Sequence, residues 1–503
     1  MSRGGDDVSV WRAAAVDLGA ESGRVVVGEL GDGAFTLDEV HRFPNAGVSV
    51  RGRVYWDVLG LFQEILCGLG EARRRHGELS SVGVDTWGVD FALIDRAGAL
   101  LGNPHHYRDP RTAGTVEFVA ERVSPQALFE RTGLQPMRFN TLFQLLAMAR
   151  TNPEALWVAD RLLMMPDLYH YWLGGEAVNE QTIATTSQMY DQRSHGWASE
   201  LLESLELPAS LLHPPVPPAT PLGPLLPAVR AATGLARARV VAPASHDTAS
   251  AVAAVPFASG RAAYISSGTW SLMGVVLPAP VLTDEVRRAG FANEGGVDGT
   301  TRLLKNITGL WLVQECRRTW ARAGAGLDYA ALEALMEETG PFGSVIDPDH
   351  ESLLDPADMP RAIRERCVRT GERAPSSPGE TLRVAVESLA CKYRHTLDQL
   401  EGIGGQRIEV IHVVGGGSRS RILCQLTADL CDRPVLAGPV ETTSLGNLMA
   451  QALAGGIARG WDEARALVHR GQRYEEYHPR DRARWEDTYQ RFRARLERAA
   501  PAA

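Results

Sequence analysis

Asp247 stands where an apolar run gives way to small residues: it follows residues 240–242 (VVA) and precedes residues 249–255 (ASAVAAV). This order predicts a short buried strand and then a helix, and the partial positive charge of a helix start favours an ionised carboxylate. An ionised carboxylate can accept a hydroxyl proton, and general-base catalysis of this kind contributes about 10²–10⁴ in rate. Asp and Thr are also favoured N-caps, and on spacing alone the cap is the more common role of Asp247.

A glycine-rich octet, residues 17–24 (DLGAESGR), offers a second kind of chemistry. Its glycines let backbone amides approach an anionic oxygen, Ser22 and Arg24 add hydrogen-bond donors, and Asp17 can hold a cation. These groups suit the phosphates of Mg-ATP, while the same residues also make an ordinary tight hairpin turn. The octet is not a Walker-type loop, because no Gly-Lys-Ser/Thr follows its glycines.

Two later segments combine glycine with hydroxyl groups. Residues 266–271 (SSGTWS) offer four hydroxyls that can close on the same phosphates, or form a plain β-turn. The three glycines of residues 415–418 (GGGS) carry no Cβ at a strand-to-helix bend, as a nucleotide lying on the backbone requires, although three glycines alone more often mean flexibility. Residues 16–19 (VDLG) and 265–269 (ISSGT) each place a glycine and polar residues after an apolar strand, which suggests a pseudo-repeat.

Residues 85–90 (DTWGVD) place two carboxylates, a hydroxyl, an indole and a glycine within six positions. Sugars are bound by such sets, in which polar groups contact the hydroxyls and an aromatic face covers the apolar side; a strand with alternating exposed acids is the plain alternative. His105 and His106 are interpreted as packing residues rather than metal ligands, because no second ligand cluster is spaced to join them.

The elements that must position these residues follow from apolar periodicity. Strands are predicted at 13–18 and 25–30, as a hairpin turning at 31–33, and at 82–84 and 89–94 with a turn at 95–98. A helix is predicted at 57–75. Further along, strands are predicted at 262–266 and 411–414, and a helix at 422–430.

Eight prolines between positions 208 and 227 predict an irregular loop or linker, because each fixes φ and removes an amide donor. The arginine-rich end, 480–498, interleaves Trp485, Tyr489, Phe492 and Leu496 at near-helical spacing. We interpret it as an amphipathic helix with a solvated basic face rather than an RNA-binding tail.

Bulk properties narrow the class of protein. A chain of 503 residues is expected to form two large domains whose contact leaves a cleft. A composition with 44% hydrophobic residues is that of a soluble globular protein, and a net charge of −9 argues against nucleic acid or anionic membrane as partners. No signal peptide or membrane span is predicted, so we expect a cytoplasmic protein whose six cysteines are reduced and mostly buried thiols.

The ordered set of segments 16–25, 83–91, 107–109, 140–145, 245–252, 262–274, 304–307 and 413–417 resembles the FGGY family of carbohydrate kinases over nearly the whole chain. The resemblance implies an α/β fold, the two-domain actin-like ATPase (ribonuclease H-like) fold with an interdomain cleft. It implies an N-terminal domain at 10–255 for sugar and phosphate, a C-terminal nucleotide domain at 256–475 and the amphipathic helix at 476–503.

Residue roles are implied by the same resemblance. Asp247 corresponds to the catalytic proton acceptor and Asp17 to an acid near Mg²⁺. The positions that match the family's ATP contacts are Ala20, Glu21, Ser22, Gly23, Arg24, Thr269, Gln314 and Gly416. Those that match its sugar contacts are Gly88, His246, Asp247, Thr248 and Asn306. Glu21 departs from the small polar residue that close relatives often carry, and Trp87 is either a support or a sugar contact.

The activity implied is ATP-dependent phosphorylation of L-rhamnulose to L-rhamnulose 1-phosphate in L-rhamnose catabolism, by a monomer or homodimer. The alternatives are a kinase for another ketose or polyol, such as L-fuculose, L-xylulose or glycerol, and a non-catalytic sugar- or nucleotide-binding regulator on the same fold.

Overall fold

The chain divides into two units, each assembled from separate stretches of sequence. The computed structural model describes residues 10–31, 34–257 and 261–499. Unit 1 consists of the described residues of Met1–Pro256, Leu277–Leu303 and Thr442–Gln472; unit 2 consists of those of Phe257–Val276, Leu304–Glu441 and Arg473–Ala503. Two stretches beyond position 255 thus belong to unit 1.

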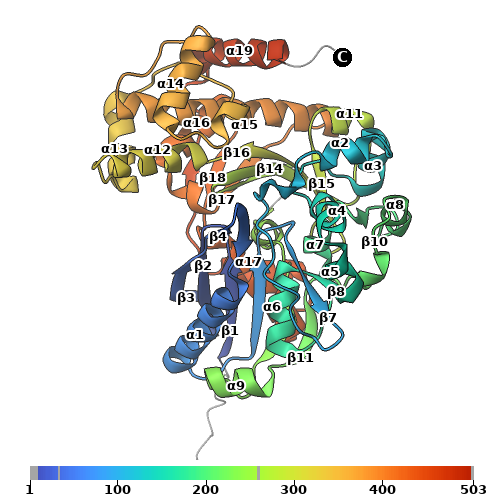
Figure 1. The fold of residues 1–503 in the computed structure, drawn as a ribbon. Helices are drawn as coiled ribbons and strands as arrows, with labels where there is room; N and C mark the ends of the chain where they lie inside the picture. Colours follow the sequence, from blue (N-terminus) through green and yellow to red (C-terminus); the bar gives the residue numbers. More distant parts are fainter. Residues whose placement is uncertain (1–9, 32–33, 258–260, 500–503) are drawn as a thin grey trace, which may run out of the picture. The chain divides into compact units, whose positions relative to one another are not determined.

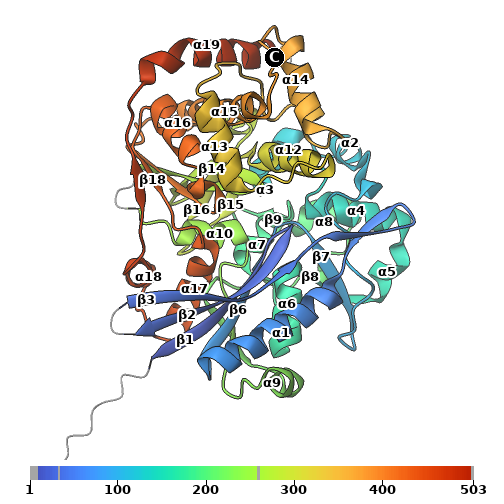
Figure 2. The ribbon, with the colours of Figure 1, turned by 90° about the vertical axis from the view of Figure 1, so that its left-hand side faces the viewer.

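A six-stranded sheet with the order β11-β12-β6-β1-β2-β3 forms the centre of unit 1. Its strands are β1 (Trp11–Leu18), β2 (Ser22–Gly31), β3 (Ala34–Pro44), β6 (Ser81–Thr86), β11 (Thr220–Pro224) and β12 (Arg239–Ala242). β1, β2 and β3 are antiparallel neighbours (Figure 2), whereas β1, β6 and β12 run parallel. The carboxyl ends of β1, β6 and β12 therefore lie at the same edge of the sheet.

Both faces of this sheet are covered, which explains the almost continuous apolar run of β1. Ala14, Val16 and Leu18 share an apolar cluster with residues of α1 (Val58–His76) and α6 (Met165–Gly174). Figure 1 shows both helices beside this sheet. The alternate residues Ala13 and Ala15 pack with α10 (Asp247–Ala253) and α17 (Thr442–Ala454). The period of two places these sets on opposite faces.

The hairpin, helix and strand predictions for the first hundred residues are confirmed, with shifted ends. β1 and β2 form the hairpin, although its turn lies at residues 19–21, and the further turn expected at 31–33 falls partly outside the described residues. The predicted helix is α1, where the Asp57 side chain accepts a hydrogen bond from the Gly60 amide as an N-cap. The strand expected at 89–94 is β7 (Phe91–Asp95), which pairs with β8 (Ala159–Met164) outside the six-stranded sheet.

The prediction of an irregular segment from 208 to 227 is wrong at β11, which contains Pro221 and Pro224. β11 is an edge strand, and only one of its sides is paired, so a missing amide can face away from the ladder. The register shifts between Pro221 and Gly223, where Gly223 has φ +95°.

Further elements of unit 1 are β4 (Gly47–Val50), β5 (Arg53–Trp56), a 3₁₀ turn (Pro110–Thr112), α2 (Thr115–Ala120), α3 (Pro125–Thr132), α4 (Thr141–Thr151), α5 (Pro153–Val158), α7 (Gln181–Ala184), β9 (Tyr190–Asp191), β10 (Gly196–Trp197), α8 (Ser199–Ser204), a 3₁₀ turn (Ala209–Leu211), α9 (Pro227–Thr233), α11 (Asp284–Arg288), β15 (Ala292–Gly295) and α18 (Trp461–His469).

In unit 2 a sheet runs in the order β16-β14-β13-β17-β18-β19. The strands are β13 (Ala262–Ser267), β14 (Trp270–Leu277), β16 (Thr301–Thr308), which enters this unit at Leu304, β17 (Val410–Val414), β18 (Val435–Ala437) and β19 (Glu475–Tyr477). The helices are α12 (Trp311–Arg322), α13 (Tyr329–Thr339), α14 (Met359–Arg369), α15 (Pro378–Gly404), α16 (Arg421–Cys431) and α19 (Arg482–Ala499), with 3₁₀ turns at Glu351–Leu353 and Gly416–Arg419.

The predicted strands and helices of this part are confirmed, and so is the amphipathic end: Trp485, Tyr489 and Phe492 of α19 are buried. The two units share a motif, because β13 pairs antiparallel with β14 and parallel with β17, as β1 does with β2 and β6. This common pairing supports the pseudo-repeat. Within the described part of the chain, no helix combines the length and apolar character that a bilayer crossing requires. Five of the six cysteines are buried.

Candidate active site

Three aspartates lie at the carboxyl edge of the unit 1 sheet. The β1–β6 register pairs Asp17 with Asp85, and the residue after Asp85 bridges the backbone of His246, directly before Asp247. The carboxylates affect one another, since Asp17 raises the pKa of both Asp85 and Asp247. The family resemblance had placed Asp17 and Asp247 in one site. The sheet register adds Asp85 and brings the three carboxylates to the same edge.

Asp247 opens α10, but it does not cap it. The N-cap position belongs to His246, and the Asp247 Oδ1 atom instead accepts hydrogen bonds from Thr248, 2.5 Å from its amide and 3.1 Å from its Oγ1. Burial raises the pKa of Asp247 above its ordinary value and Asp17 adds to the rise, while His246 and Thr248 oppose it. The side chain is 30% exposed, so this carboxylate, more basic than a free aspartate, is accessible to a substrate.

Asp17 is 4% exposed and forms an ion pair with Arg24, whose Nη2 and Nε atoms lie 2.5 and 2.9 Å from Asp17 Oδ2. The turn between them is closed by the Gly19 amide, which donates to the Ser22 carbonyl at 3.0 Å. Asn45 holds the same turn by donating its side-chain amide to the Gly19 carbonyl at 2.7 Å.

Two further positions of the octet have definite surroundings. A Cβ on Gly23 would lie 2.3 Å from the Phe43 ring, so the close strand packing requires glycine there. Glu21, in contrast, is exposed at the turn.

Asp85 is fully buried, and the sequence-based site set omitted it. Its Oδ2 accepts a hydrogen bond from Asn447 Nδ2 at 2.6 Å, while its Oδ1 has no hydrogen-bond partner among the described residues. Burial and then Asp17 raise the pKa of Asp85 well above the ordinary value. The available signal was its position at the end of an apolar strand parallel to β1.

A buried carboxylate oxygen without a partner, next to a second acid, fits a hard divalent cation. Mg²⁺ is usually held by one or two carboxylates together with water and substrate phosphates. Asp17 and Asp85 match that donor chemistry, whereas the described residues contain no preformed cluster of three or more metal-ligating side chains.

Gly88 and Val89 form a strained bend after β6. Val89 has φ +70°, which is unfavourable for a β-branched residue. Hydrogen bonds enforce it: the Val89 amide donates to Thr186 Oγ1 at 3.1 Å, and its carbonyl accepts from Thr141 Oγ1 at 2.6 Å. Strain maintained in this way is typical of functional segments, here the one that resemblance assigns to the sugar.

Asp90 and Trp87 form a buried hydrogen-bonded layer next to this bend. Asp90 is buried and accepts hydrogen bonds from Trp56 Nε1 at 2.6 Å, Trp87 Nε1 at 3.0 Å and Gln144 Nε2 at 2.7 Å. Trp87 is 5% exposed and its ring centroid lies 4.1 Å from that of Trp56. Trp87 therefore packs as a buried support of Asp90 and Trp56.

The histidine pair belongs to the same aromatic layer. His106 stacks on Trp56 with centroids 4.1 Å apart, and His105 lies 4.5 Å from Tyr55. Burial lowers the pKa of both histidines to about 4, so they are neutral packing residues, as predicted.

Glu180 holds the strand-to-helix bend that presents Asp247. It is fully buried and accepts hydrogen bonds from the Ser245 amide at 3.0 Å and from Thr182 Oγ1 at 2.6 Å. Thr182 Oγ1 in turn accepts from the His246 amide at 3.2 Å. Burial raises the pKa of Glu180 from 4.5 to about 7, against the effect of its hydrogen bonds to Thr182.

This raised pKa predicts a pH-dependent stability. Because the folded-state pKa lies above the unfolded value, the contribution of Glu180 is fully present below pH 4.5 and is lost as the pH rises through about 7. The loss is on the order of 3 kcal/mol. The melting temperature of Glu180→Gln relative to that of the native protein should therefore rise as the pH increases from 5 to 8. The exposed control Glu176→Gln should show no such rise. A pH-independent difference would contradict the assignment.

Unit 2 gathers a second set of predicted residues. The amides of Leu310 and Trp311 donate to the carbonyls of Gly268 and Thr269 at 3.0 and 3.1 Å, which places this turn at the start of α12. Gln314 lies one turn further along α12, and its Oε1 is buried without a hydrogen-bond partner among the described residues.

The glycine segment approaches the same turn. A Cβ on Gly417 would lie 2.0 Å from Ser267 Oγ, so this approach requires glycine, while Gly416 has free space around its Cβ position. Asn306 is exposed on β16. The structure thus places Thr269, Gln314 and Gly416 near the ends of β13 and β17.

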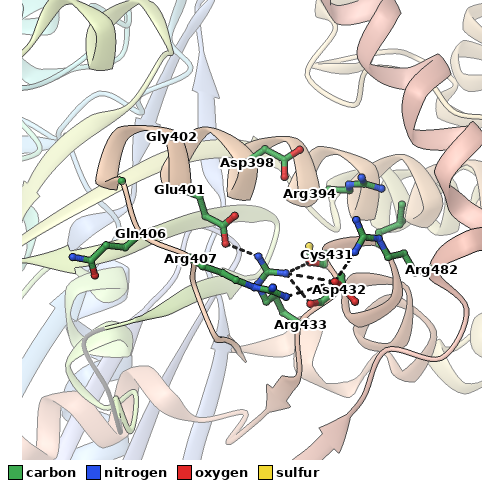
Figure 3. Close-up of a pocket in the computed structure, with 12 residues that line it drawn as sticks. Arg394, Asp398, Glu401, Gly402, Gln406, Arg407, Cys431, Asp432, Arg433 and Arg482 are labelled. Carbon is green, nitrogen blue, oxygen red and sulfur yellow. Dashed lines mark hydrogen bonds and ion pairs between the residues drawn. The ribbon is translucent and has the colours of Figure 1, made fainter.

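A cavity of about 620 Å³ in unit 2 lies elsewhere (Figure 3). Its arginines are paired with acids: Arg433 Nη2 lies 2.6 Å from Glu401 and Arg482 Nη1 2.7 Å from Asp432. None of the residues predicted for sugar or ATP lines it.

Family models match both parts of the chain. The N-terminal domain of the FGGY family of carbohydrate kinases matches residues 13–254, and its C-terminal domain matches residues 263–455. A rhamnulokinase of Bacteroides thetaiotaomicron is 44% identical over 479 residues, covering 95% of this chain and 98% of that protein. A rhamnulokinase of Pectobacterium carotovorum is 39% identical over 492 residues, covering 97% of each.

Solved structures show the same fold. A xylulose kinase from Rhodospirillum rubrum matches with a TM-score of 0.77 at 21% identity, covering 97% of this chain and 98% of its own. Plasmodium falciparum glycerol kinase with ADP matches with a TM-score of 0.78 at 16% identity, covering 98% and 99%. The predicted α/β fold of the actin-like ATPase type is confirmed.

Proposed function

Because the chain belongs to the FGGY family of carbohydrate kinases, we propose that it transfers the γ-phosphoryl group of ATP to the O1 hydroxyl of L-rhamnulose. The products are L-rhamnulose 1-phosphate and ADP. The observation that carries the reaction type is Asp247, an accessible carboxylate with a raised pKa at the end of a strand-to-helix bend. The substrate rests on the rhamnulokinases to which the chain is 44% and 39% identical.

In the proposed mechanism Asp247 accepts the O1 proton as the sugar oxygen attacks the γ-phosphorus. The new O–P bond forms while the bond from that phosphorus to the leaving ADP oxygen breaks. The hydrogen bonds from Thr248 keep the Asp247 carboxylate oriented toward α10, so the proton is taken by a fixed group. Fixed geometry of this kind is a large part of phosphoryl-transfer catalysis.

Binding roles are assigned as follows in the proposal. The sugar is contacted by Gly88, His246, Thr248 and Asn306. ATP is contacted by Ala20, Glu21, Ser22, Gly23, Arg24, Thr269, Gln314 and Gly416. Asp17 and Asp85 would hold Mg²⁺, which when bound would offset negative charge on the phosphates. The buried, unpartnered Oδ1 of Asp85 and Oε1 of Gln314 support these assignments, since each is an acceptor that a ligand can satisfy.

The closing experiment is an ADP-release assay over L-rhamnulose, L-fuculose, D- and L-xylulose, L-ribulose and glycerol. We expect the highest kcat/KM with L-rhamnulose. We also expect the protein to be cytoplasmic and to be a monomer or homodimer. Preference for another ketose would replace the substrate and keep the reaction type. ATP or sugar binding without sugar-dependent turnover would instead identify a regulator and reject the kinase.

A further inference from the structure

The His246 ring lies between two carboxylates. Its Nε2 is 3.4 Å from Asp247 Oδ1, and its Nδ1 is 3.3 Å from Glu294 Oε2. The side chains of His246 and Glu294 are 8% and 9% exposed. The 3.4 Å contact is longer than an ideal hydrogen bond, so a small rotation of the ring decides whether it is kept.

Arg302 contacts both the His246 ring and Glu294. It is fully buried, and its Nη2 lies 3.0 Å from Glu294 Oε2 and 3.2 Å from His246 Nδ1. Its Nε donates to the Gly295 carbonyl at 2.9 Å, which fixes the guanidinium plane. Although burial works to raise the pKa of Glu294, Arg302 and His246 hold it below the ordinary value, so Glu294 is a carboxylate.

The proton positions on the ring follow from these contacts. An ionised Asp247 requires a proton on Nε2, because a lone pair there would face the carboxylate. Nδ1 then either accepts from Arg302 or, in the imidazolium, donates to Glu294. Arg302 is the partner of Nδ1 in the first state and Glu294 is its partner in the second. The partner of one ring nitrogen therefore sets the state of the other.

We propose that Glu294 is a positioning residue for the phosphoryl transfer. With Arg302 it fixes the rotation and protonation of His246, so that Nε2–H faces Asp247 and keeps the base oriented and ionised. This inference rests on the proposed kinase function, and Glu294 acts through His246 without touching the reacting atoms.

The first test is a double-mutant cycle of Glu294→Gln with His246→Gln, using the ketose that turns over fastest. Glu294→Gln should lower kcat about tenfold or more with the sugar dissociation constant changed less than about threefold. In the His246→Gln background the same change should alter kcat less than about twofold, because the route through the ring is gone. Additive effects would overturn the proposal, as would an unchanged kcat in Glu294→Gln.

Two variants separate positioning from folding. Glu294→Asp keeps the charge beside Arg302 but withdraws it from Nδ1, and a loss of kcat with an unchanged melting temperature is expected. Glu285→Gln makes the same chemical change at an exposed position of α11 and should leave kcat unchanged. Native kcat in Glu294→Asp would contradict the role.

A measurement without turnover keeps this inference distinct from the kinase proposal. The ¹⁵N shifts of the His246 ring, assigned by their loss in His246→Gln, should show a protonated Nε2 in the native protein and a changed pattern in Glu294→Asp. An unchanged pattern would reject the positioning role even in an active enzyme. A changed pattern in a protein inactive toward every sugar would reject only the kinase.

Discussion

Asp247→Asn is expected to lower kcat by about 10²-fold or more, while the sugar dissociation constant changes by less than about threefold. Asparagine has nearly the same shape and its carbonyl oxygen can still accept the hydrogen bonds from Thr248, which lie at 2.5 and 3.1 Å. The amide cannot take up the O1 proton, so the loss falls on the chemical step. ADP release gives kcat, and calorimetry without ATP gives the sugar affinity.

Asp298→Asn is the matched control, because Asp298 is exposed in the same unit and has φ +56°, a conformation that asparagine also tolerates. Its kcat should equal that of the native protein. Near-native turnover in Asp247→Asn would remove this residue from the mechanism and leave the proton acceptor unassigned.

Gly446→Ala is expected to destabilise the folded protein strongly. Gly446 lies on α17 where it crosses α10, and a Cβ there would lie 1.8 Å from the Ser250 carbonyl oxygen and 2.5 Å from its carbon. Backbone atoms cannot rotate away, so α10 must shift, and overpacking of this kind costs about 1–3 kcal/mol. Because α10 begins at Asp247, turnover should fall as well.

Gly70→Ala should instead stabilise the folded protein. Gly70 lies in the interior of α1, and a Cβ there would meet no described atom within 4 Å. Alanine should stabilise this helix by about 0.5–1 kcal/mol. Melting temperatures compare the variants without assuming two-state unfolding, which a chain of two units need not follow. A shift of both variants in the same direction would contradict the packing argument.

Much of the sheet of unit 1 was predictable, because local pattern and burial agree there. β1 is covered on both faces, so its run of apolar residues predicts a strand without regard to its neighbours. β11 was missed because its prolines are tolerated only at a sheet edge, and edge position depends on the whole topology. The pairing of β7 with β8 also depends on a partner distant in sequence.

Part of the site could be found in the same way. Asp17 and Asp247 follow apolar runs, and family resemblance assigned their roles. Glu294, Arg302 and Asn447 carried no such signal, because each comes from a segment distant in sequence. Glu294 and Arg302 contact His246, and Asn447 contacts Asp85. The strained backbone of a valine at position 89 contradicts its local preference, which is why only the structure reveals it.

The placement of α17 has a consequence for biosynthesis. Asn447 bonds Asp85, and Leu445 and Leu448 cover the face of β1 that carries Ala13 and Ala15. Translation delivers these residues long after the strands they protect, so a ribosome-bound intermediate keeps an apolar sheet face open to water. Truncated chains that end before α17 should aggregate or recruit chaperones. A circular permutant that moves α17 ahead of β1 should fold earlier during synthesis.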